Sequence, residues 1–149
     1  MAITKIQSES LNLADDFAFT GTITGAGTSA EYGTWTPTVT VTDGGTFNSA
    51  SNLVAKYVKV GQLVYITIET GSISTGGSPA VYASYEFTLP FTSAEVSTGL
   101  GWEYGQTGQG MRLSTTVNGT VVQVRAASSS VNFIANAYLR LAFVYKSTS

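Results

Sequence analysis

Residues 56–68 read KYVKVGQLVYITI, and this stretch decides the fold. Two runs rich in β-branched and aromatic residues meet at Gly61-Gln62, where a glycine at the first central position favours a type II′ turn. The sequence therefore predicts a β-hairpin that pairs Val60 with Leu63, Val58 with Tyr65, Tyr57 with Ile66 and Ala55 with Ile68. The first two pairs share one face and the last two share the other, so both faces are apolar. Because a half-solvated hairpin alternates strictly, we expect cover on both sides, from a second sheet and, as a candidate, from a neighbouring subunit.

The composition supports a chain whose surface is partly covered by other chains. The sequence has 149 residues, enough for one domain with a single core. Only 11% of the residues are charged, against roughly 25% in an ordinary soluble domain. The formal net charge is −2, so the chain has no basic stripe for nucleic-acid phosphates and we expect no nucleic-acid partner.

The chain contains no cysteine and no histidine. Their absence from the sequence removes disulfides, cysteine-based zinc sites, cysteine nucleophiles and the Ser-His-Asp triad. The first residues lack the apolar core of a signal peptide, and no apolar run approaches the roughly 20 residues of a membrane helix. We therefore expect synthesis in a cytoplasm, no export by the usual signal and no membrane insertion.

Two zones are visible along the chain. Residues 1–32 hold few large apolar side chains and include a run rich in glycine, threonine and serine, so we expect an extended arm and linker. Four large side chains in this arm alternate as a strand would, and without a core of their own they need something to dock against: Leu11, Leu13, Phe17 and Phe19. Residues 33–149 form the predicted β-domain.

The β-domain reads as a series of short strands. Residues 81–89, 99–104 and 137–146 alternate or carry strand-forming residues, and Pro37 favours an edge strand for the run that contains it. Asn118-Gly119 predicts a type I′ hairpin that sets Leu113 opposite Val124, Met111 opposite Ala126 and Arg112 opposite Arg125. The fold class is therefore all-β, with roughly eight strands in two packed sheets, a jelly-roll-like β-sandwich preceded by the arm.

Three segments carry a family resemblance: GTWTPTV (33–39), YVKVGQLVYI (57–66) and FTLPFT (87–92). They resemble the small β-domains of bacteriophage tail-fibre and other virion-appendage proteins. Residues 6–27 resemble the segment that precedes such domains, especially in phages of cyanobacteria and other marine hosts. The resemblance implies a homotrimer that attaches to the virion. Some such domains bind host-surface glycans, and others decorate a capsid.

Two pairs of residues are the binding candidates. Trp102 and Tyr104 share a face and are flanked by glycines, so they can stack on sugar rings, although packing in a core or a subunit interface is the commoner role of such aromatics. Arg112 and Arg125 are like charges in a destabilising position, so an acidic group should lie between them. That group is either Glu86 or Glu103 from an adjacent strand or a neighbouring chain, or an acid on a partner, such as a sugar acid or a capsid carboxylate.

No catalytic, metal or cofactor site follows from the sequence. Asp15-Asp16 lacks the alternating oxygen ligands of a calcium loop, and nothing places Glu86 and Glu103 at the separation of a glycosidase pair. We therefore expect a non-enzymatic structural protein of a bacteriophage virion, a homotrimeric tail-fibre or appendage β-domain that contacts the host surface. The alternative is a capsid decoration protein whose arm binds the major capsid protein. A polysaccharide-degrading tailspike is disfavoured by length and by the lack of a β-helix repeat.

Overall fold

A computed structural model describes residues 29–78, 80, 82–128, 134 and 136–149. The described chain is all-β, as the sequence predicts, and it contains no helix long and apolar enough to cross a membrane. Its strands are β1 (Ala30–Trp35), β2 (Val39–Val41), β3 (Gly45–Ala50), β4 (Val54–Val60), β5 (Leu63–Glu69), β6 (Ile73–Gly77), β7 (Tyr85–Thr88), β8 (Thr98–Glu103), β9 (Gly110–Ser114), β10 (Val121–Ala126) and β11 (Leu139–Lys146).

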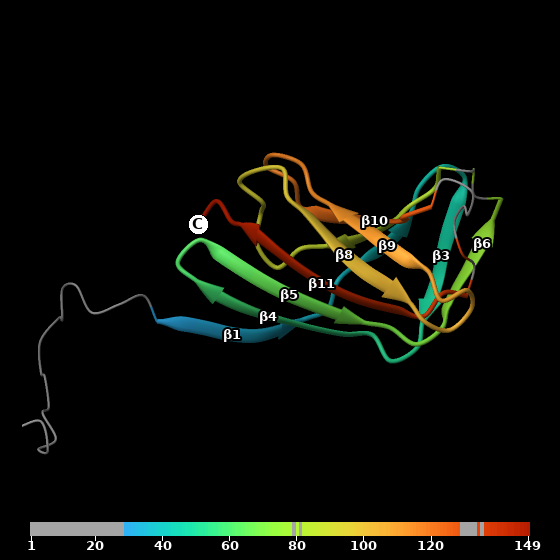
Figure 1. Cartoon of the computed structure of the whole chain (residues 1–149), viewed down its shortest axis with the longest axis horizontal. Coiled ribbons are helices and arrows are strands. Elements are labelled where there is room, and N and C mark those ends of the chain that lie inside the picture. Colours follow the sequence, from blue (N-terminus) through green and yellow to red (C-terminus); the bar gives the residue numbers. More distant parts are fainter. Residues whose placement is uncertain (1–28, 79, 81, 129–133, 135) are drawn as a thin grey trace, which may run out of the picture.

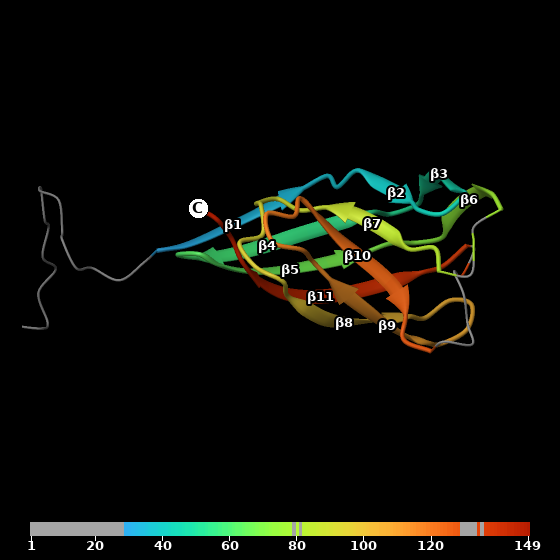
Figure 2. The same ribbon diagram turned by 90° about the horizontal axis from the view of Figure 1, so that it is seen from above.

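Nine strands form one antiparallel sheet in the order β1-β4-β5-β11-β8-β9-β10-β7-β2. The two edge strands, β1 and β2, follow one another in the chain and are separated only by residues 36–38. The sheet must therefore curl until its two edges approach each other, and Figures 1 and 2 show this strong curl. The indole N–H of Trp35 donates to the carbonyl of Thr88 on β7, and the Thr88 N–H donates to the carbonyl of Thr38 (2.9 and 3.0 Å), so the edges meet there.

A two-stranded ribbon of β3 and β6 stands at one end of the curled sheet (Figure 1). Ile73 on β6 is fully buried and donates its backbone N–H to the carbonyl of Ala137. Phe47 on β3 packs against the same core. The ribbon therefore closes this end of the hydrophobic interior.

The β4–β5 hairpin has the predicted register, with Val60 opposite Leu63 and Tyr57 opposite Ile66. Gly61 has a φ of 61°, the left-handed value that the first central position of the predicted turn requires. Ala55, Ile66 and Ile68 are buried inside the curl. The inner face of the hairpin is covered, by the far half of the same sheet, whereas Val60, Leu63 and Tyr65 on the outer face are exposed. Cover of the outer face by a neighbouring subunit stays a prediction.

The core lies inside the curl and is built from alternate residues of each strand. The predicted alternation of β11 is confirmed, since its inward side chains are all buried: Leu139, Leu141, Phe143 and Tyr145. The rings of Phe143 and Tyr145 stack 5.7 Å apart, and the Tyr145 hydroxyl donates to the carbonyl of Phe91. Burial raises the pKa of Tyr145 to about 12, so its hydroxyl stays protonated.

The arrangement of the sheets differs from the prediction. The chain forms one sheet of nine strands and one of two, instead of two packed sheets with roughly eight strands in total. β6 is a strand that the sequence did not predict, and β7 is shorter than the predicted strand at 81–89. The sequences of β3 and β6 are GTFNSA and ISTGG, which contain few strand-forming side chains. These strands form because they pair with each other and pack against the end of the core.

The predicted register around Asn118-Gly119 is confirmed, but the turn type is not. Arg112 lies opposite Arg125 and Leu113 lies opposite Val124. Only Asn118 has a positive φ, whereas a type I′ turn needs positive φ at both central residues. The Gly119 N–H instead closes a turn onto the carbonyl of Thr116, and the Ser93 N–H donates to the Gly119 carbonyl.

The first strand begins before the predicted domain boundary at residue 33. Ala30, Glu31 and Tyr32 pair with Val60, Lys59 and Val58 on β4, so the described β-domain includes the last residues of the predicted linker. The predicted docking side chains of the arm all lie outside the described residues: Leu11, Leu13, Phe17 and Phe19.

Candidate functional site

The outer face of the sheet carries an apolar row that crosses four strands. Tyr32 on β1, Val58 on β4, Tyr65 on β5 and Val144 on β11 are neighbours in register. Tyr32 is 73% exposed, while Tyr65 and Val144 each expose nearly half of their surface. The pair of Val60 and Leu63, also exposed, extends the row toward the turn of the hairpin. We call these six residues the outer hairpin face.

β8 has its small residues on the inner face and its large apolar residues on the outer face, which is the reverse of an ordinary surface strand. Gly99 and Gly101 face the core, while Leu100 and Trp102 face outward and are 74% and 51% exposed. A side chain at Gly101 would meet the Leu141 side chain at 2.5 Å. The inward glycines therefore make room for the large residues of β11, and the outward side chains of β8 are not needed to fill the core.

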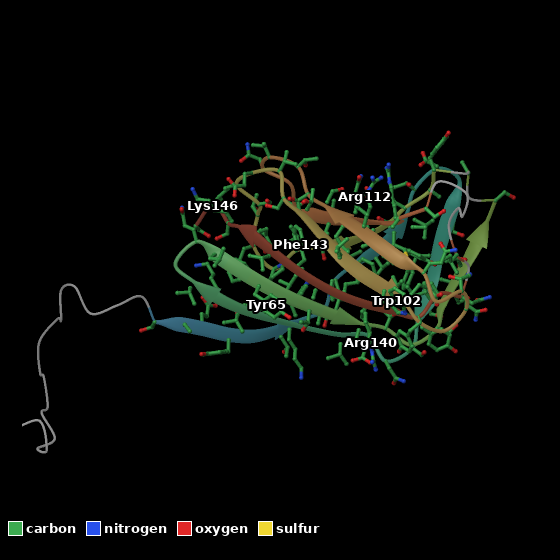
Figure 3. All side chains as sticks on the ribbon, in the orientation of Figure 1. Tyr65, Trp102, Arg112, Arg140, Phe143 and Lys146 are labelled. Atoms are coloured by element: carbon green, nitrogen blue, oxygen red, sulfur yellow. The ribbon has the colours of Figure 1, made fainter. Side chains whose placement is uncertain are left out.

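An ion pair lies beside Trp102 on the outer face. Arg140 on β11 is opposite both Trp102 and Glu69 in register. Its Nε and Nη2 donate to Glu69 Oε1 at 3.0 and 2.9 Å. The bond to Glu69 raises the pKa of Arg140, and the guanidinium lies over the ring of Tyr104, 4.7 Å from its centroid. Figure 3 shows Trp102 and Arg140 together at one end of the sheet, with Arg112 well apart from them.

A groove of about 440 Å³ opens between the hairpin and β8. Its walls are Val54, Lys56, Thr67 and Glu69 on one side and Leu100 and Trp102 on the other, with Ala142 and Arg140 of β11 between them. A second hollow of about 300 Å³ shares Val54 and Glu69 and is bounded by Tyr104. The depression lies along β11, because Ala142 has a small side chain and the outward residues of the neighbouring strands, β5 and β8, are larger.

The two predicted aromatic candidates therefore reach the same surface but differ in their surroundings. Trp102 and Tyr104 share a face, as predicted, and neither belongs to the buried core. The Tyr104 hydroxyl donates to the carbonyl of Thr70 at 3.3 Å, and its ring packs edge-on against Tyr138. Trp102 lines the groove and makes no hydrogen bond to a described residue, so it is the more available of the two.

Glu103 has a structural role in this chain. It is fully buried, and its carboxylate accepts backbone N–H bonds from Gly105, Gln106, Thr107 and Tyr138 at 2.7–3.1 Å, with a longer bond from Gly108. Burial alone would raise the pKa of this carboxyl, but the backbone bonds outweigh it and lower the pKa to about 2. The carboxylate thus fastens the β8–β9 loop to the start of β11 and has no free oxygen for a substrate.

The predicted arginine pair lies on the outer face of β9 and β10. Neither Arg112 nor Arg125 forms an ion pair with a described residue, and Arg125 Nε is buried without a hydrogen-bond partner there. Glu86, one predicted neutraliser, instead accepts from Gln123 Nε2 at 2.8 Å and from Thr40 Oγ1 at 3.4 Å. Glu103, the other, is occupied as described above. An acid on a partner remains the open alternative.

The structure adds three residues that the sequence did not single out: Leu100, Glu69 and Arg140. Leu100 was accessible to prediction, because it alternates with Gly99 and Gly101. Arg140 and Glu69 are 71 residues apart in the chain, and only the pairing of β11 with β5 brings them together.

The described residues contain no group of three side chains suited to hold a metal ion. No protein-family model matches this chain, and no curated protein matches its sequence.

Proposed function

We propose that this chain is a non-enzymatic structural protein of a bacteriophage virion, made in the host cytoplasm, whose β-domain forms a homotrimer on a tail fibre or similar appendage and contacts the host surface. The outer hairpin face carries this proposal. Five of its six side chains are exposed and Val58 between them is half-buried, and such an apolar face is typical of a surface that another protein covers. The low content of charged residues, 11%, points the same way.

The virion context is supported by the resemblance of residues 33–39, 57–66 and 87–92 to tail-fibre and appendage β-domains. The jelly-roll-like description belongs to the same proposal, because the curl brings two halves of one sheet face to face, as the sheets of a sandwich are. The absence of enzymatic activity is supported by the engagement of Glu103 with backbone amides, which removes one member of the glycosidase pair considered above.

A capsid decoration protein is the second candidate. It shares the trimer and the arm with the first candidate. In this version the arm, residues 1–32, binds the major capsid protein.

The location of the protein on the particle tests both candidates. We expect gold labelling or reconstruction of the virion to place the protein at the tail or its appendages, in few copies. Labelling over the whole shell in hundreds of copies would replace the first candidate by the second. Absence from purified particles would contradict both.

A further inference from the structure

The groove beside Trp102 combines one aromatic wall with a polar wall that is already held in place. Trp102 exposes half of its surface, and its indole N–H has no hydrogen-bond partner among the described residues. Its strand is anchored from the other side, where Gly99 and Gly101 lie against Phe143 and Leu141. An aromatic ring on a fixed strand, with one face open to a groove, is a platform for a flat ligand.

The polar wall is the ion pair of Arg140 and Glu69. The guanidinium is held on two sides, by Glu69 Oε1 and by the ring of Tyr104. Both bonds end on Glu69 Oε1, so Glu69 Oε2 accepts no hydrogen bond from a described residue, and the guanidinium has more N–H groups than the two that bond to Glu69. The pair therefore offers both an acceptor and N–H donors to the groove, and Thr67 and Lys56 line the same groove.

This set of groups discriminates among ligand classes. A wholly apolar ligand would remove water from a charged pair without replacing its hydrogen bonds. A free anion is opposed by Glu69, and a cation by Arg140 and Lys56. A peptide cannot add as a strand, because the backbone groups at the floor of the groove are already paired between β5, β11 and β8. A neutral ring with an apolar face and a rim of hydroxyls satisfies every group.

We propose that this groove binds a neutral pyranose unit of a glycan. Trp102 stacks on the C–H face of the ring, while Arg140 and Glu69 bond its hydroxyls. The volume of about 440 Å³ lies within the range of small-molecule sites, about 300–1,000 Å³. The inference rests on the proposed contact with the host surface and identifies the part of the β-domain that makes it. The groove lies toward the end of β5 away from the turn, so the outer hairpin face remains available to another copy.

The two tryptophans of the chain provide a test with an internal control. Trp35 is partly buried and its indole N–H is already bonded to Thr88, whereas Trp102 lines the groove. The full chain labelled with 5-fluorotryptophan should give two fluorine resonances. On titration with the methyl glycosides of glucose, galactose, mannose, rhamnose and N-acetylglucosamine, we expect saturable shifts of the Trp102 resonance with at least one sugar and none of the Trp35 resonance.

Two variants separate binding from folding. Ala142→Leu fills the groove with an outward side chain and leaves Trp102 in place, so we expect sugar affinity to fall about tenfold or more. Thr98→Leu makes a similar change at an exposed position of β8 outside the groove lining and should bind as the parent does. Unchanged affinity in Ala142→Leu, equal shifts of both tryptophans, or no shift with any of the five glycosides would overturn the inference.

A failure of the groove assignment can be distinguished from a failure of the proposed function. A trimer found on virions that binds none of these glycosides overturns the groove assignment and leaves the virion role standing. If the protein binds a sugar but is absent from virions, the groove assignment stands and the virion role is contradicted.

Discussion

Arg112 and Arg125 lie directly opposite each other on β9 and β10, with no acidic partner among the described residues. Two guanidinium groups in that position repel each other, so we expect Arg112→Thr to raise the free energy of unfolding by up to about 1 kcal/mol. Added salt should stabilise the parent more than the variant, because it screens the repulsion. Urea unfolding at low and high salt measures both effects. A destabilised Arg112→Thr variant would contradict the repulsion between the arginines.

The outer hairpin face predicts the oligomeric state. Light scattering of the full chain at micromolar concentration should give about three times 15.6 kDa. Tyr65→Glu places a charge in the middle of this face and should reduce the mass to that of a monomer. Val117→Glu, at an exposed position in the β9–β10 loop, is the matched control and should remain a trimer. A parent protein that is monomeric would rule out the trimer.

Alanine should destabilise the fold at Gly101, an inward position of β8, but not at Gly110, the first residue of β9. An added Cβ at Gly101 would meet Leu141 at 2.5 Å and the carbonyl of Arg140 at 3.1 Å, so Gly101→Ala should lower the free energy of unfolding by about 1–3 kcal/mol. At Gly110 an added Cβ would meet, among the described residues, Ala127 alone, at 3.8 Å, so Gly110→Ala should be neutral or stabilising by up to about 1 kcal/mol. Thermal unfolding compares them, and equal effects would contradict this account of β8.

Glu103 predicts how stability depends on pH. Its pKa is about 2 in the folded chain and 4.5 as its ordinary value, so the unfolded chain takes up the proton first as the pH falls. The stabilisation is therefore complete above about pH 4.5 and is lost toward pH 2, with a total of about 3 kcal/mol. Glu103→Gln should be less stable at pH 7 and should lose less stability over this interval, while Glu86→Gln should follow the parent. Parallel curves for the parent and Glu103→Gln would show that the buried carboxylate does not control acid unfolding.

The arm predicts how the protein is attached to the virion. Burial of Leu11, Leu13, Phe17 and Phe19 against a virion protein would contribute about 6–12 kcal/mol before the cost of ordering the arm. Three arms acting together would make attachment effectively permanent. Removal of residues 1–27 should therefore leave a folded, soluble trimer that no longer joins particles. A truncated protein that unfolds or aggregates would instead place the arm in the core of the domain.

The parts of the fold that the sequence predicted are those with local causes. The β4–β5 hairpin is specified by two adjacent apolar runs and one glycine, and the inward face of β11 by simple alternation. The β3–β6 ribbon was missed, because its weak strand formers pair only in the context of the closed end. The groove was missed for a related reason: Trp102 was visible in the sequence, but Arg140 and Glu69 reach it only through long-range pairing.

The buried role of Glu103 also depended on long-range structure. The glycine-containing loop that follows it, residues 105–108, was a local indication that backbone amides could surround a carboxylate. The bond from the Tyr138 N–H, 35 residues away, could not be anticipated without the fold.

The inverted placement of residues on β8 has a consequence for how this protein can evolve. Its inward glycines are constrained by the large side chains that lie against them, whereas Leu100 and Trp102 face outward and fill no space in the core. Substitutions at the two outward positions should therefore have little effect on the stability of the fold, so selection for folding constrains them weakly. A lineage can exchange these side chains, and with them its ligand preference, while its thermal stability stays the same. Sequence variation among related proteins should accordingly concentrate at the outward positions of β8 and be nearly absent from its inward positions.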